Sequence, residues 1–274
     1  MRKLFLAIAF LFFATNAVAA DFNHSGWDIL LRQNVTLVRG GKASQVNYSG
    51  FAQNRNSLRA YLASTGAVTQ TEFNSWSNPA QLAFLINVYN ANTIELVLDG
   101  YPNIRSIREL GRFGQTPWQR QVVKIFGAMR TLDHVEHWLI RGSSRYNDPR
   151  IHFALNCAAV SCPALRPEAY VGSRLEAQLE DQTHKFLSDP TRNQLYGNEL
   201  KVSSIFRWYR GDFQNGNRGF RSLNDFFIHY AADLNLDPQS VARLRNGQIR
   251  IVYLPYNWDL NSFSTSIRDR LSPH

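Results

Sequence analysis

The chain has 274 residues, of which 44% are hydrophobic and 13% aromatic, enough to build a sizeable core. Its formal net charge is +9 at pH 7, but the basic residues are spread along the chain, which argues against a nucleic-acid-binding protein. Because the sequence contains no Pro- or Ser-rich linker, low-complexity tract or internal repeat, we expect a single domain.

The N-terminus has the layout of a secretory signal peptide. Two basic residues open it, residues 4–14 are almost continuously apolar, and small residues at 17–20 precede the polar Asp21. The apolar run is shorter than the about 20 residues that a membrane-spanning helix needs. We therefore expect residues 1–20 to be cleaved and residues 21–274 to form the mature domain, exported to the periplasm or secreted, with no transmembrane anchor.

Helical patterns dominate the first hundred residues. Apolar side chains at helical spacing predict amphipathic helices around residues 27–31 and 58–62. Asn78 followed by proline is a favourable helix start, because Asn can cap a helix and proline suits its first turn. A long helix is therefore expected over residues 79–99, and Gly100 ends it.

The helix expected over residues 79–99 is apolar around nearly its whole circumference, which predicts that it is buried. It nevertheless carries Asn87 and Asn90, three positions apart on one face. A buried amide costs stability unless it finds hydrogen-bond partners. Two interpretations stay open: the amides tie down neighbouring loops, or they line a polar cleft and orient a catalytic group or a substrate.

The second half of the chain mixes strands with helices. Residues 122–126 and 128–129 predict a β-hairpin broken at Gly127, and a short capped helix is expected from about Thr131 or Asp133 to Arg141. Residues 150–156 alternate between apolar and polar side chains, which predicts a strand that delivers Cys157 to a turn. Further helices are expected over residues 175–187 and 223–234, and further strands over residues 200–202 and 249–254. The predicted class is α+β, with several helices packed on one mixed or antiparallel sheet.

Both cysteines lie in the segment 151–163, Ile-His-Phe-Ala-Leu-Asn-Cys-Ala-Ala-Val-Ser-Cys-Pro, which follows Glu136 and His137 by a short gap. Thiol, imidazole and carboxylate are the groups that thiol catalysis uses, and they also bind metal ions. Cys157 and Cys162 can equally form a disulfide. Since that bond would close a very short loop, a disulfide scaffold is not expected to be the main source of stability.

Several of these motifs resemble domain-of-unknown-function family 547. The segments that carry the resemblance are residues 82–91, Leu132, 135–137, 139–141, 152–157, 161–163, 205–209, 212–213 and 254–261. Together they cover most of residues 27–261. The resemblance implies a fold and a set of motif residues, but it implies no settled activity.

The first interpretation of the site is a thiol enzyme. Cys157 would be the nucleophile, with Cys162 as the rival, and His137 or His152 would be the general base. On an extended strand the side chains of His152 and Cys157 point to opposite sides, so His137 is expected to be the better partner.

Glu136, Asn87 or Asn90 would orient the imidazole, as the third member of a catalytic triad does. The reaction would be hydrolysis or acyl transfer at an amide, isopeptide or thioester bond, and the substrate a peptide or a component of the cell envelope. A cysteine-peptidase-like or transglutaminase-like fold is one form that the expected α+β class could take. No cofactor is expected.

Two other interpretations compete with the thiol enzyme. In a zinc site, His134 and His137 would share an ion with His152 or a cysteine, although His134 lies outside the family pattern. In a non-catalytic binding module, the Asn, Glu and His side chains would form a buried polar network, and the cysteines would be inert or paired. A thiol–disulfide oxidoreductase is disfavoured, because four residues rather than two separate Cys157 from Cys162.

The aromatic residues near position 210 have a simpler expected role. Trp208, Tyr209 and Phe213 are expected to belong to the core. Asp212 is expected to cap a helix or to pair with Arg207 or Arg210.

Overall fold

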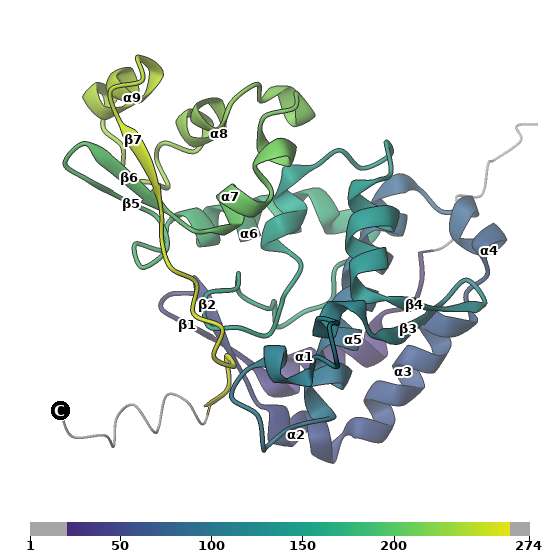
Figure 1. The fold of residues 1–274 in the computed structure, drawn as a ribbon. Helices are drawn as coiled ribbons and strands as arrows, with labels where there is room; N and C mark the ends of the chain where they lie inside the picture. The colour runs from purple at the N-terminus through teal and green to yellow at the C-terminus, as the bar shows by residue number, and fades with distance from the viewer. Residues whose placement is uncertain (1–20, 264–274) are drawn as a thin grey trace, which may run out of the picture.

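The computed structural model describes residues 21–263 (Figure 1). The predicted signal peptide, residues 1–20, lies outside this range. The α-helices are α1 (Ser25–Asn34), α2 (Tyr48–Gln53), α3 (Arg55–Ala67), α4 (Gln70–Ser75), α5 (Asn78–Leu98), α6 (Leu175–Leu187), α7 (Ile205–Trp208), α8 (Leu223–His229) and α9 (Pro238–Arg245). The strands are β1 (Val35–Val38), β2 (Ala43–Val46), β3 (Gln121–Ile125), β4 (Ala128–Thr131), β5 (Gln194–Tyr196), β6 (Glu199–Val202) and β7 (Arg250–Tyr253). The class is α+β, as predicted.

Within residues 21–263 the strands form three small sheets rather than the single sheet that we expected. β1 pairs with β2 and β3 with β4, both antiparallel, while β6 lies between antiparallel β5 and parallel β7. With three to five residues each, the strands pair locally, and helices separate the three groups along the chain. The β3–β4 hairpin, whose position was predicted, packs against α3 and α5.

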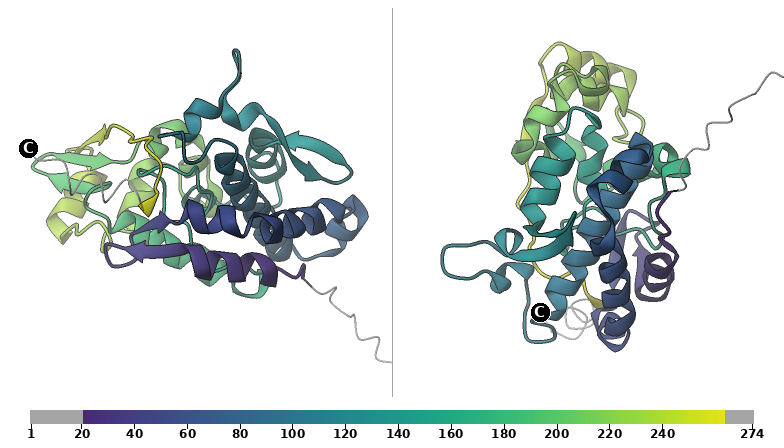
Figure 2. Two further views of the ribbon diagram at one scale, coloured as in Figure 1. Left: turned by 90° about the horizontal axis from the view of Figure 1, so that it is seen from below. Right: turned by 90° about the vertical axis from the view of Figure 1, so that its right-hand side faces the viewer.

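Buried apolar side chains gather in two clusters. The larger one is built around α1, α3 and α5, and the smaller one around α6, α7 and α8. Figures 1 and 2 show the same division: α1–α5 lie at one end of the molecule, and α7–α9 with β5–β7 lie at the other.

Helix α5 runs through the larger cluster and is buried along almost its whole length, as its sequence predicts. Its N-cap is Ser77, whose hydroxyl accepts a hydrogen bond from the backbone N–H of Ala80, so Asn78 is the first helical residue and not the cap. None of the helices in the described part of the chain combines the length and apolar character of a membrane span.

The prediction of a strand over residues 150–156 is wrong. It begins with a 3-10 helix, η4 (Pro149–Phe153), which Asp148 caps by accepting a hydrogen bond from the backbone N–H of Arg150. The alternation of apolar and polar side chains does not come from a strand. Ile151 packs into the larger apolar cluster and Phe153 into the smaller one. Since the segment lies between two cores, both of its sides are buried, and period-two burial does not identify a strand here.

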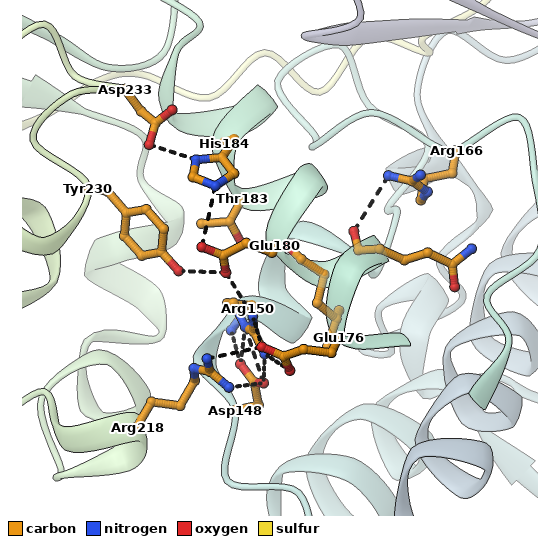
Figure 3. Close-up of polar contacts among 12 residues, drawn as sticks. Asp148, Arg150, Arg166, Glu176, Glu180, Thr183, His184, Arg218, Tyr230 and Asp233 are labelled. Carbon is orange, nitrogen blue, oxygen red and sulfur yellow. Dashed lines mark hydrogen bonds and ion pairs between the residues drawn. The ribbon is translucent and has the colours of Figure 1, made fainter. Parts of the chain in front are cut away.

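A buried guanidinium anchors η4. The side chain of Arg150 is fully buried and donates hydrogen bonds to Asp148, Glu176 and Glu180, as Figure 3 shows. Glu180 also accepts a hydrogen bond from the hydroxyl of Tyr230, 3.0 Å away. Because a buried charge is tolerated only when it is paired, three carboxylates around one cation hold η4 against α6 and the C-terminal elements.

We predict that Arg150→Met lowers the free energy of unfolding by about 3–5 kcal/mol, because it removes one partner of a buried charge cluster and leaves the carboxylates facing each other. The measurement is urea denaturation followed by far-UV circular dichroism. The matched control is Arg174→Met, since Arg174 is half-exposed and pairs with Glu168 at the surface; its expected cost is below about 1 kcal/mol. Equal losses for the two variants would contradict this role of Arg150.

Candidate functional site

A cavity of about 310 Å³ opens where the two apolar clusters meet. Its lining comes from α5, the segment 116–119, the segment 133–137, η4 with the residues after it, α7 and the segment 256–258. The lining residues are Tyr89, Thr116, Trp118, Gln119, Asp133, Glu136, His137, His152, Leu155, Cys157, Cys162, Pro163, Ile205, Trp208, Tyr209, Tyr256 and Trp258. Five of the seven predicted site residues are therefore in one cavity, and Asn87 and Asn90 are not among them.

The acidic side of the cavity comes from a π-helix, η3 (His134–Arg141). Its Glu136 is buried, at 5% exposure, and the hydroxyls of Tyr89 and Tyr209 hydrogen-bond to it. Burial, together with the neighbouring negative charge of Glu136, raises the pKa of both tyrosines far above the ordinary value, so both hydroxyls stay protonated and donate. A π-helix is rare and often occurs at functional sites.

His152 forms the centre of a buried polar group. Its Nε2 lies 2.7 Å from Oδ2 of Asp212, and its ring stacks on that of Tyr209 with the centroids 3.9 Å apart. The guanidinium of Arg141 donates two hydrogen bonds to the same carboxylate, at 2.6 and 3.2 Å. Because a carboxylate accepts, His152 carries its proton on Nε2 and leaves Nδ1 with a free lone pair.

The groups around Asp212 stabilise its ionised form. Burial alone would raise the pKa of Asp212, but the hydrogen bonds and charges of His152 and Arg141 outweigh it and hold the pKa well below its usual value. Burial lowers the pKa of His152, against the opposing effect of Asp212 and Glu136. At neutral pH the pair is therefore an ionised carboxylate and a neutral imidazole, the state that a general base needs.

His137 is fixed in one tautomer by a neighbouring cation. Nη1 of Arg141 lies 2.9 Å from Nδ1 of His137, and a guanidinium can only donate. The imidazole proton therefore sits on Nε2, and the nearest carboxylate oxygen to that nitrogen is Oδ1 of Asp133, at 3.8 Å. His137 is thus arranged as a hydrogen-bond donor, whereas His152 has the free basic nitrogen.

Cys157 and Cys162 are joined by a disulfide, with their Cα atoms 6.1 Å apart. Cys162 is buried, while Cys157 is partly exposed and its Sγ lies 3.1 Å from the hydroxyl oxygen of Tyr256. No hydrogen bond joins Cys157 to either imidazole in the described part of the chain. A thiol at this position therefore requires reduction of the disulfide.

The loop between the cysteines folds around a buried cation. The guanidinium of Arg192 donates hydrogen bonds to the backbone oxygens of Val160 and Cys162, both at 2.7 Å, and pairs with Asp189. This arrangement satisfies carbonyls that a tight loop would otherwise bury without partners. It also brings a positive charge close to Tyr256, whose pKa Arg192 lowers in opposition to the larger effect of burial.

The two asparagines of α5 hold backbone segments. Asn87 donates to the backbone oxygen of Tyr170 at 2.7 Å and accepts from its N–H at 3.0 Å. Asn90 donates to the oxygen of Ala154 at 3.0 Å and accepts from the N–H of Asn156 at 2.8 Å. These contacts agree with the loop-holding interpretation, and those of Asn90 fix the chain immediately before Cys157.

The ligands of the zinc interpretation are not assembled. Both cysteines are used in the disulfide, and among residues 21–263 no three His, Cys, Asp or Glu side chains are arranged to hold a metal ion.

Sequence reasoning missed several residues of this site. Asp212 was expected to pair with Arg207 or Arg210, which is wrong: its partners are Arg141 and His152, 71 and 60 positions away. Trp208 and Tyr209 were expected in the core, yet both line the cavity. The available signal was that these residues, like Trp258, lie inside or beside the recognised motifs.

Residues 73–187 match the profile of a family described as "Protein of unknown function, DUF547". The matched segment includes α5, η3, η4 and both cysteines, and it confirms the resemblance predicted from the motifs. No curated protein and no solved structure matches the chain. The cysteine-peptidase-like form of the fold stays a prediction.

We predict that nitrogen-15 NMR finds the proton of the neutral imidazole on Nε2 in both His137 and His152. His152 should stay neutral below pH 6.5, because its folded-state pKa is lowered; the stability that depends on it is complete above pH 6.5 and decreases as the pH falls. Arg141→Met should release His137 into a mixture of tautomers. A proton on Nδ1 of His152 in the native protein would contradict the assigned hydrogen bond to Asp212.

Proposed function

We propose that this chain, whose residues 73–187 match the DUF547 family profile, is a thiol-dependent hydrolase or acyltransferase. Cys157 would be its nucleophile after reduction of the disulfide with Cys162. The observation that carries the proposal is that Cys157 lines the same cavity as His152, whose Nε2 is bound to the partly buried carboxylate of Asp212. This is the base-and-orienter arrangement that activates nucleophiles in unrelated enzymes.

The roles follow from the tautomers. Nδ1 of His152 would take the proton of the Cys157 thiol, and Asp212 would stabilise the imidazolium that forms. His137, the preferred base at the outset, is the less suitable one, because Arg141 occupies its Nδ1 lone pair. Since the thiol and the imidazole are not hydrogen-bonded in the oxidised protein, their contact would form only in the reduced state or with substrate, as is common for catalytic hydrogen bonds.

The reaction would proceed in two steps. The Cys157 thiolate attacks an acyl carbonyl, the bond from that carbon to the leaving nitrogen or sulfur breaks, and His152 returns its proton to the leaving group. The product of this step is a thioester on Cys157. Water or an amine then attacks the thioester with His152 as base, which releases the acid or the new amide and restores the thiol.

Activation would need two electrons from a dithiol or another thiol reductant, which is oxidised to a disulfide while Cys157 and Cys162 become thiols. Two neighbours favour the resulting thiolate. The hydroxyl of Tyr256 already contacts Sγ of Cys157, and the charged guanidinium of Arg192 donates a hydrogen bond to the backbone oxygen of Cys162. Hydrogen-bond donors and cations lower the pKa of a thiol and so make it reactive near neutral pH.

A non-catalytic binding module is the second candidate. The observation that favours it is the disulfide itself, because paired cysteines have no nucleophilic thiol. In that case the polar groups would position a ligand in the cavity, and neither cysteine would be needed as a thiol.

The test uses Cys157→Ser, Cys162→Ser and the wild-type protein with 4-nitrophenyl acetate, a small activated acyl donor, and a phosphine reductant. We expect acetylation of wild type only after reduction, acetylation of Cys162→Ser without reductant, and none of Cys157→Ser. In the Cys162→Ser background, His152→Gln should slow acetylation by about 10²-fold or more. Intact-mass spectrometry and cleavage of the thioester by hydroxylamine give the readout.

Cys162→Ser is the matched variant, because it removes the disulfide but keeps the proposed nucleophile. Equal acetylation of Cys157→Ser and Cys162→Ser, or an unchanged rate in His152→Gln, would overturn the enzyme and favour the binding module.

A further inference from the structure

The cavity has a charge opposite to that of the chain. Among the described residues 21–263, its lining includes the carboxylates of Asp133 and Glu136 but neither lysine nor arginine, although the whole sequence has a formal net charge of +9. The two histidines in the lining are not permanent cations, and His152 has a lowered pKa. A ligand that enters this space therefore meets negative charge.

Glu136 lacks a direct cationic partner. It is buried, it is hydrogen-bonded by tyrosine hydroxyls, and the nearest basic nitrogen is Nδ1 of His137, at 4.0 Å. Within residues 21–263 no lysine or arginine forms an ion pair with it, because the nearby guanidinium of Arg141 is bound to Asp212 and His137. A buried carboxylate is costly without a paired cation, and an entering cation would supply one.

Asp133 adds a second carboxylate beside the first. It lies three residues before Glu136, and it is half-buried. Burial raises the pKa of Asp133, His137 opposes this effect, and the charge of Glu136 adds to it. The two carboxylates therefore repel each other, and a cation between them would relieve the repulsion.

The tryptophan side chains that line the cavity also favour a cationic ligand. Trp258 is in ring contact with both Trp118 and Trp208, with ring centroids 5.6 Å and 5.8 Å apart. The indole of Trp258 already has one cation beside it, because the guanidinium of Arg108, which is not among the lining residues, lies 5.5 Å from its ring centroid. Indole faces attract cations, by about 0.5–1 kcal/mol at exposed sites and more where water is excluded.

We propose that the cavity binds a primary ammonium group attached to an apolar chain, as in a lysine-type or diamino-acid side chain of a peptide. The ammonium would lie against Asp133 and Glu136, and the methylene chain would lie along the tryptophans. That this ligand is also the substrate rests on the proposed function; the binding itself needs no thiol.

The test is a titration of the native, disulfide-bonded protein with Nα-acetyl-lysine amide, followed by tryptophan fluorescence. Nα-acetyl-norleucine amide is the matched ligand, because it keeps the alkyl chain and lacks the ammonium. We expect the lysine compound to bind at least 10-fold more tightly, and added salt to weaken it.

Matched variants identify the carboxylates. Asp133→Asn and Glu136→Gln should each weaken lysine-amide binding at least 5-fold, whereas Glu72→Gln, at an exposed position of α4, should not change it. Equal affinity for the two ligands, no fluorescence response to either, or unchanged binding in both cavity variants would overturn the inference. The titrated protein is disulfide-bonded and has no free thiol at Cys157, so a failure of the acetylation test leaves this test intact.

Discussion

The hydrogen bonds that leave the buried helix α5 are the constraint on which the candidate site depends. An amide inside an apolar helix is stable only if its donor and acceptor are both used, and Asn90 uses them on Ala154 and Asn156. The chain that leads to Cys157 is thereby attached to a helix that is buried along almost its whole length. Arg150 holds the same chain from its other end, through three carboxylates. A cysteine that follows a segment fixed at both ends is well positioned for chemistry, since reactive groups work best on rigid supports.

The cavity exists because two apolar clusters meet at η4 without merging. Polar side chains at such a junction can be buried on one side and open on the other. His152 is buried there and binds the partly buried Asp212, which also binds Arg141, while Cys157 is partly exposed. The disulfide to Cys162 and the acidic, aromatic lining belong to the same space. The redox state of the disulfide and the charge of a bound ligand would therefore both affect the proposed nucleophile, Cys157.

Local sequence patterns predict much of this fold and only part of the site. Helix α6 has the bounds that its periodicity predicts, and α5 is buried as its composition requires. The predicted strand over residues 150–156 is wrong, because alternation caused by two cores looks like alternation caused by a sheet. The partners of Asp212 could not be predicted, since they lie 60 and 71 positions away and depend on how the two clusters pack. Sequence alone predicted Cys157, His137, His152 and Glu136 as candidate site residues, all of which line the cavity, but it predicted neither Asp212 as the partner of His152 nor the tautomers that favour His152 over His137 as the base.

The most direct test of the central claim, that Cys157 and His152 act as a pair, is the pH profile of Cys157 alkylation by iodoacetamide in the Cys162→Ser background. We expect an apparent pKa for Cys157 at least one unit below the ordinary thiol value of about 8.5. In His152→Gln this pKa should move back toward 8.5, because the imidazole no longer takes the proton. A pKa near 8.5 that is the same with and without His152 would show that the two residues do not act as a pair and would leave the cavity as a binding site.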